Sequence, residues 1–122
     1  MQRTMLQLNL KDCAAAIAFY QNAFGAVVDA IHRDRETGDI MHAEIRAFSQ
    51  CIAFSERAVP TVPGNTMQFC FHFGPGHEAA VEKAYACMKD GAEVDFPLGP
   101  CDWSPMMFSL TDTFGVHWCL FV

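Results

Sequence analysis

The chain has 122 residues, of which 52% are hydrophobic and 18% charged, so it is long enough for one domain and too apolar to be disordered. Fourteen Asp and Glu against eight Lys and Arg give a formal charge of -6, which argues against binding to nucleic acid or an anionic membrane. No apolar run approaches the ~18 residues of a membrane span, and the first ten residues do not resemble a signal peptide. The composition therefore predicts a cytoplasmic protein.

The first half of the chain is predicted to form a strand, a helix and three more strands. Residues 6–10 alternate leucine with polar residues, which is the period of a strand with one apolar face. Apolar residues then recur at helical spacing over 13–24, between Asp12 as the N-cap and Gly25 just past the end. The strands expected after this helix are 27–32, 40–48 and 51–55.

The second half repeats this order after a linker at 59–66, which contains Pro60, Pro63 and Gly64. Phenylalanines alternate with other residues over 69–73, and an amphipathic helix is expected to end before Gly91, the counterpart of Gly25. The strands expected after this helix are 93–96, 106–110 and 116–122. The sequence thus predicts an α+β domain spanning 1–122, with one βαβββ module at 1–58 and another at 67–122. We expect a curved mixed sheet with its helices on the convex face.

The other face of this sheet is the expected ligand site. If each helix covers one face, alternate strand positions face the concave side, and a concave surface with polar and aromatic side chains is typical of a small-molecule pocket. His42, Glu44 and Arg46 alternate with apolar Ala43 and Ile45. The residues predicted to line the pocket are Gln7, His42, Glu44, Phe54, Glu56, Gln68, Trp103, His117 and Cys119.

The six cysteines form no C-x-x-C pair, and four of them lie within apolar runs. We therefore expect reduced thiols packed as small core residues rather than a disulfide scaffold, while a catalytic cysteine stays open.

Three stretches of the chain resemble a known family. The strand–helix–three-strand repeat is similar to the vicinal oxygen chelate superfamily, which includes glyoxalase I, extradiol dioxygenases and proteins for bleomycin and fosfomycin resistance. The resemblance is closest to its PhnB-like branch. Some PhnB-like relatives carry a methyltransferase label, but no glycine-rich loop here supports S-adenosylmethionine binding. The matching stretches are 16–20 with 23–26 (AIAFY, AFGA), 41–45 (MHAEI) and 111–118 (TDTFGVHW).

The resemblance also implies where a divalent metal would bind. Enzymes of the superfamily hold it with four His, Glu or Gln ligands, one near each of the first, fourth, fifth and eighth strands. In this chain those positions fall on Met5, Glu56 (or Ser55 if the register slips by one), Gln68 and Cys119. Only Glu56 is a good ligand for a hard cation, because Met and Cys are soft donors and Gln is a weak neutral one, so no divalent metal and no other cofactor is expected.

Each candidate also has a structural interpretation. His42 has a counterpart in the PhnB-like motif, but His42, Glu44 and Arg46 would equally suit a structural network. His117 is flanked by bulky residues, which favours a buried structural histidine. Trp103, in the loop 99–105, is expected either to cover a ligand or to pack the loop down. Glu56 would serve as a general base if desolvated, and otherwise as a polar rim residue.

The preferred hypothesis is a metal-free PhnB-like homodimer that binds a small organic ligand in this pocket. One alternative is a metal-dependent lyase, isomerase or dioxygenase that recruits Glu56 and His42. Another is an antibiotic-sequestering resistance protein, in which Trp103, Phe54 and Phe121 form an aromatic groove and the acidic charge attracts a cationic drug. The sequence assigns no catalytic residue and leaves open whether the protein is an enzyme.

Overall fold

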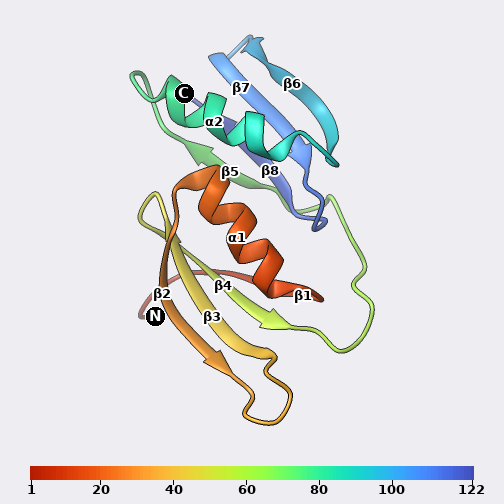
Figure 1. Cartoon of the computed structure of the whole chain (residues 1–122). Coiled ribbons are helices and arrows are strands. Elements are labelled where there is room, and N and C mark those ends of the chain that lie inside the picture. The colour runs from red at the N-terminus through yellow and green to blue at the C-terminus, as the bar shows by residue number, and fades with distance from the viewer. The chain divides into compact units, whose positions relative to one another are not determined.

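The computed structural model describes all 122 residues and divides into two compact units, module 1 at Met1–Val62 and module 2 at Pro63–Val122. The boundary falls within the predicted linker. Both modules have the expected order of elements, so the α+β fold and its repeat are confirmed (Figure 1). The elements of module 1 are β1 (Leu6–Leu10), α1 (Cys13–Phe24), β2 (Val27–Arg33), β3 (Ile40–Ala47) and β4 (Gln50–Glu56). Those of module 2 are β5 (Phe69–His72), α2 (Glu78–Met88), β6 (Glu93–Cys101), β7 (Ser104–Thr111) and β8 (His117–Phe121).

Each module builds its own four-stranded mixed sheet. The strand orders are β1-β4-β3-β2 and β5-β8-β7-β6, with the first strand of each module parallel to its neighbour and the other pairs antiparallel. The single mixed sheet expected from the sequence is therefore two separate sheets of the same topology. The edge strands are β1 and β2 in module 1, and β5 and β6 in module 2.

The first helix begins and ends where the sequence predicts. The Asp12 side chain accepts a hydrogen bond from the Ala15 amide, and Gly25 adopts a φ of 64°, a conformation that glycine reaches without a Cβ clash. The buried side of α1 packs on β3 and β4, and its Tyr20 ring stacks on Phe24 at 5.6 Å. This packing fixes which face of the first sheet is covered.

The second helix covers its sheet in the same way but has different ends. His77 at its N-cap makes no side-chain capping bond, and the C-cap is Lys89 in the right-handed conformation, so Gly91 lies two residues further on. Val81, Ala84 and Met88 are fully buried, and α2 contacts β7 and β8. No helix of the structure is long and apolar enough to cross a membrane.

Candidate functional site: two polar sheet faces

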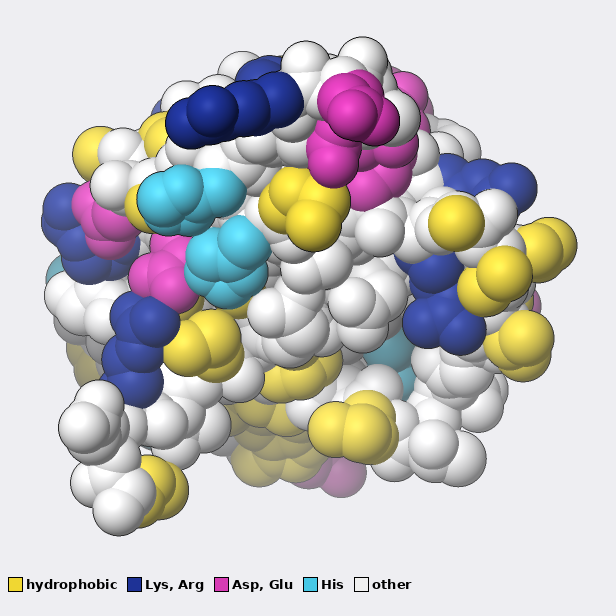
Figure 2. Space-filling view, turned by 90° about the horizontal axis from the view of Figure 1, so that it is seen from below, with side chains coloured by type: hydrophobic (Ala, Val, Ile, Leu, Met, Phe, Trp, Pro, Cys, Tyr) yellow, Lys and Arg dark blue, Asp and Glu magenta, His cyan; other side chains and the backbone are white.

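The uncovered face of the first sheet carries a charged cluster. Ala43 and Ile45 are 0% exposed beneath α1, which leaves His42 and Glu44 on the opposite face, as strand alternation predicts. We call this surface the first face and define it by Arg3, Gln7, His42, Glu44 and Ser55. Figure 2 shows histidine, acidic and basic side chains gathered side by side on one surface of the molecule.

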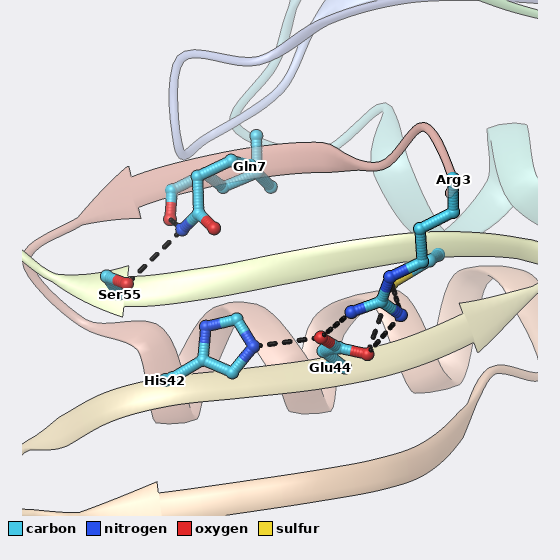
Figure 3. Close-up of polar contacts among 7 residues, drawn as sticks. Arg3, Gln7, His42, Glu44 and Ser55 are labelled. Carbon is cyan, nitrogen blue, oxygen red and sulfur yellow. Dashed lines mark hydrogen bonds and ion pairs between the residues drawn. The ribbon is translucent and has the colours of Figure 1, made fainter. Parts of the chain in front are cut away.

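Glu44 is the centre of this cluster (Figure 3). Its carboxylate accepts two hydrogen bonds from the Arg3 guanidinium, at 2.8 and 2.6 Å, and one from His42 Nε2 at 2.9 Å. The Arg3 hydrogen bonds, followed by the one from His42, lower the pKa of Glu44 to about 2. Glu44 is therefore a fixed carboxylate that organises its neighbours, and it is unsuited to act as a general base near neutral pH.

Two further contacts complete the first face. Gln7 Nε2 donates to Ser55 Oγ at 3.3 Å across the parallel pair β1–β4. Arg46, which the alternation had grouped with His42 and Glu44, forms a separate ion pair with Asp29 at 2.9 Å. His42 therefore bonds to the Glu44 carboxylate and Arg46 to the Asp29 carboxylate, so the three residues expected to act together form two separate contacts.

The uncovered face of the second sheet holds a different network, the second face, defined by Gln68, Cys70, Asp95, Ser109 and His117. Gln68 Nε2 donates to Ser109 Oγ at 2.9 Å, and Ser109 Oγ donates to Asp95 Oδ2 at 3.3 Å. His117 Nε2 lies 3.1 Å from Gln68 Nε2 and 3.0 Å from Asp95 Oδ2. One imidazole nitrogen therefore faces an amide donor and a carboxylate acceptor together.

No protonation state of His117 satisfies every partner. A proton on Nε2 serves Asp95 but leaves the Gln68 amide hydrogen without an acceptor. A proton on Nδ1 lets Nε2 accept from Gln68, but Nδ1 is buried and has no hydrogen-bond partner. Nδ1 therefore lacks a partner in both states, and in the first state the Gln68 amide hydrogen lacks an acceptor as well, which is costly for a side chain only 13% exposed.

Aromatic side chains continue this surface along β8. Cys119 and Phe121 alternate with Trp118 and Leu120, which are 0% exposed. The ring of Phe121 stacks on His72 at 4.6 Å, and Trp103 meets it edge-on at 4.8 Å. Trp103 is 59% exposed.

Trp103 does not lie in the long loop expected from the sequence. Strands β6 and β7 extend to Cys101 and Ser104, so only Asp102 and Trp103 form the turn between them. Pro100 and Pro105 had indicated a loop, but Pro100 lies in the edge strand β6, which tolerates proline because one side of an edge strand needs no backbone partner, and Pro105 is the second residue of β7.

Two predicted pocket residues lie on the wrong side of β4. Phe54 is 0% exposed, with its ring 6.1 Å from that of Tyr20 in α1. Glu56 Oε2 accepts a hydrogen bond from the Cys13 amide at 3.2 Å, at the N-terminus of α1. The expectation that these two residues line the open face is corrected, because the register slips by one and Ser55 takes that position.

The structure also adds residues that the sequence analysis left out. Ser109 lies between buried Phe108 and Leu110, so alternation along β7 alone would have placed it on the open face. Asp95 lies within a register shift in β6, which breaks the alternation, and Arg3 precedes the first strand. No periodic signal marks those two residues.

Neither of two surface cavities contains the predicted pocket set. One of about 480 Å³ in module 1 is bordered by Glu56 and Arg57 beside the turn at 34–39. One of about 280 Å³ in module 2 adjoins the second face through Asp95. The residues that line this second cavity are Pro63, Gly64, Asn65, Glu93, Asp95 and Thr111.

The positions implied for a metal do not offer a fitting donor set. Glu56 is turned to the helix, which leaves Ser55 at the open fourth-strand position. A thioether, a hydroxyl, an amide and a thiol from Met5, Ser55, Gln68 and Cys119 are a poor set for a hard divalent ion. Neither module brings together three His, Cys, Asp or Glu side chains around one point.

Comparison with solved structures shows that other proteins share this fold. The chain matches PA1353 of Pseudomonas aeruginosa at 22% identity, covering 99% of this chain and 97% of that one, with a TM-score of 0.81. It matches a Bacillus cereus PhnB protein, described as a putative 3-demethylubiquinone-9 3-methyltransferase, at 19% identity, 98% coverage of both chains and a TM-score of 0.75.

A third solved structure is a point mutant of the fosfomycin resistance protein FosX of Listeria monocytogenes, in complex with Mn(II) and 1S,2S-dihydroxypropylphosphonic acid. The match has 17% identity, covers 99% of this chain and 92% of that one, and has a TM-score of 0.73. At these identities the structures establish a shared fold. No curated protein matches the chain. The family model for the Glyoxalase/Bleomycin resistance protein/Dioxygenase superfamily matches residues 3–120, and the chain belongs to that superfamily.

Proposed function

We propose that this protein is a PhnB-like member of the superfamily that binds a small organic molecule on the second face without a divalent metal. The observation that carries the proposal is the position of His117 Nε2, which faces the Gln68 amide donor and the Asp95 carboxylate together. When Nε2 is protonated and bonds to Asp95, a ligand hydroxyl or carboxamide placed there would accept the free Gln68 amide hydrogen and donate to the Asp95 carboxylate.

The aromatic residues suggest the rest of the ligand. Phe121 lies four residues after His117 on the same side of β8, which is about 13 Å at the rise of an extended strand. A flat or apolar part of the molecule would pack against Phe121 and Trp103 while its polar group reaches His117. The proposed ligand is therefore elongated, with a polar end and an aromatic or aliphatic end.

No divalent metal is proposed, because the side chains at the positions implied for one are poor donors. Met5 and Cys119 offer only soft sulfur donors and Gln68 only a weak neutral amide, and the one acidic candidate, Glu56, already binds the Cys13 amide. His42 lies on the first face, where Arg3 and Glu44 neutralise each other. That face is the competing location for the ligand, and Gln7, His42 and Glu44 are its candidate contacts.

A matched pair of glutamines tests the location. Gln68 immediately precedes β5 and Gln7 is the second residue of β1, and each donates its amide to a serine hydroxyl. A ligand found by a thermal-shift screen of elongated alcohols and amides would be titrated by calorimetry into Gln68→Ala and Gln7→Ala. The proposal expects at least a tenfold loss of affinity in Gln68→Ala and less than a twofold change in Gln7→Ala. The reverse pattern would move the site to the first face.

A second candidate function is sequestration of a cationic drug. It is supported by exposed Trp103 beside Phe121, together with the acidic groups Asp95 and Glu93. Phe54, which had supported this hypothesis, is buried and does not contribute. Calorimetric titration with a cationic glycopeptide of the bleomycin type tests it, and micromolar binding that is lost in Trp103→Ala would favour it.

The proposal includes a homodimer in the cytoplasm. Val27 and Ile31 on the edge strand β2 are 52% and 41% exposed, and exposed apolar side chains on an unpaired edge are typical of an association surface. The six free cysteines suit a reducing compartment.

A further inference from the structure

Two cysteines lie directly opposite each other on the second face. Cys70 of β5 and Cys119 of β8 are Cα partners in the parallel pair of strands. Neighbouring strands run about 4.7–4.9 Å apart, which is within the 4.4–6.8 Å separation of Cα atoms that a disulfide accepts. Side chains at paired positions point to the same side of a sheet, so the two sulfurs can meet without a change of fold.

The two thiols differ in exposure as a redox pair requires. Cys70 is exposed, whereas Cys119 is 5% exposed. Burial, followed by the nearby Cys70 thiol, raises the pKa of Cys119 to about 11. An oxidant in solution therefore reaches Cys70 first, and Cys119 lies beside it to complete the reaction.

We propose that Cys70 and Cys119 are an oxidation site that forms a reversible disulfide with low-molecular-weight disulfides such as glutathione disulfide. The Cys70 thiolate attacks one sulfur of the oxidant, forms a mixed disulfide and releases one thiolate. Cys119 then loses its proton to solvent and attacks the Cys70 sulfur, which expels the second thiol. The protein loses two hydrogens and the oxidant is reduced to two thiols.

The site is connected to the polar network of the second face. Cys70 Sγ donates to Gln68 Oε1 at 3.7 Å, and Gln68 in turn contacts Ser109 and His117. Disulfide formation removes this thiol donor and draws Cys70 toward β8. Oxidation therefore changes the hydrogen bonds of the residues proposed to hold the ligand, although the disulfide itself does not depend on that proposal.

Cys101 supplies the control, because it is the other thiol that affects the pKa of Cys119. The fully reduced chain would be incubated with glutathione disulfide, digested without reductant and analysed by mass spectrometry, with Cys101→Ser and Cys70→Ser treated in parallel. We expect a linked peptide joining Cys70 to Cys119, two of the six thiols lost per chain and full recovery with dithiothreitol. Cys101→Ser should react as the wild type does, and Cys70→Ser should react at least tenfold more slowly.

A variant at the second cysteine separates the two steps. Cys119→Ala should stop at the mixed disulfide, with one glutathione on Cys70. Linkage of Cys70 to Cys101, linkage only between chains, or retention of all six thiols in the folded wild type would overturn the proposal. The peptide map of the wild type tests the disulfide even where a variant fails to fold.

Discussion

Glu44 shows how a single residue sets the character of the first face. Two hydrogen bonds from Arg3 and one from His42 favour its ionised form, so it remains a carboxylate at any ordinary pH. Alternation along β3 was sufficient to place Glu44 with His42. The partner that fixes its charge, Arg3, lies 41 residues away in the sequence and precedes β1.

Removal of Arg3 should raise the pKa of Glu44. The wild-type pKa of about 2 lies below the ordinary value of 4.5, so any stability that this carboxylate contributes is present above pH 4.5 and is lost as the pH falls through about 2. Carboxyl-carbon NMR titration of Arg3→Ala should show Glu44 titrating closer to 4.5. Arg46→Ala, which removes the guanidinium paired with Asp29, is the matched control and should leave Glu44 unchanged.

His42 should contribute little to stability. Its side chain is 38% exposed and bonds only to a carboxylate that Arg3 also holds. The urea midpoint of His42→Ala should therefore correspond to a loss of less than about 1 kcal/mol. A collapse of the midpoint would mean that His42 is a structural residue, whereas weaker ligand binding with an unchanged midpoint would locate the ligand on the first face.

At the scale of secondary-structure elements, the N-terminus of α1 donates hydrogen bonds to carboxylates from two parts of the chain that lie far apart in the sequence. The Ala15 amide donates to Asp12 of the same segment, and the Cys13 amide donates to Glu56 at the end of β4. A carboxylate at this position satisfies a free amide and interacts favourably with the helix dipole. Glu56, at the end of strand β4, therefore caps the N-terminus of helix α1.

Loss of this cap should be measurable. Glu56→Ala should destabilise the protein by about 1 kcal/mol in urea unfolding. Glu82→Ala, on the exposed side of α2, should stay within about 0.5 kcal/mol of the wild type. If Glu56→Ala were equally neutral, the capping role would be wrong and Glu56 would again be available as a pocket residue.

The strength of the alternation decides how much of the site the sequence could predict. In β3 the pattern His-Ala-Glu-Ile-Arg alternates strictly, and the structure confirms the two faces. In β4 the run Ile52-Ala53-Phe54 is apolar throughout and fully buried, so its period gives no register and the pocket was assigned one residue out. The networks themselves depend on side chains from several strands, which no local pattern reports.

At the scale of the whole chain, one fold is used twice with different surfaces. The first face is an ion-pair cluster, whereas the second combines an amide, an imidazole, two thiols and aromatic rings. The repeated topology was predictable because strand and helix periods recur in both halves. The chemistry of each face was less predictable, because it depends on positions such as Asp95, which lies within a register shift.

Divalent metals should stabilise this protein little. With a thioether, an amide and a thiol at three of the four positions that the superfamily uses, tight binding of Mn, Fe, Ni or Zn is not expected. Adding each ion should therefore leave the melting temperature nearly unchanged, since only ions that bind the native state raise it. A stabilisation of several degrees by one ion, abolished by a chelator, would favour the metal-dependent alternative.

The molar mass of the protein in solution, measured by light scattering, should equal that of two chains. The prediction follows from Val27 and Ile31, which are exposed on the edge strand β2. Val27→Lys combined with Ile31→Lys should shift the mass toward one chain if this edge forms the interface. A wild-type mass of one chain at micromolar concentration would contradict the homodimer.

The proposed ligand binds along the second face, between His117 and the aromatic residues around Trp103. The most direct test is its dissociation constant, measured by calorimetry for the wild type, Trp103→Ala and Met41→Ala. Met41 is the matched control because it lies in module 1 and its exposed fraction, 60%, nearly equals the 59% of Trp103. We predict that Trp103→Ala weakens binding about tenfold or more while Met41→Ala leaves it unchanged. Equal affinities in all three proteins would contradict a ligand site on the second face.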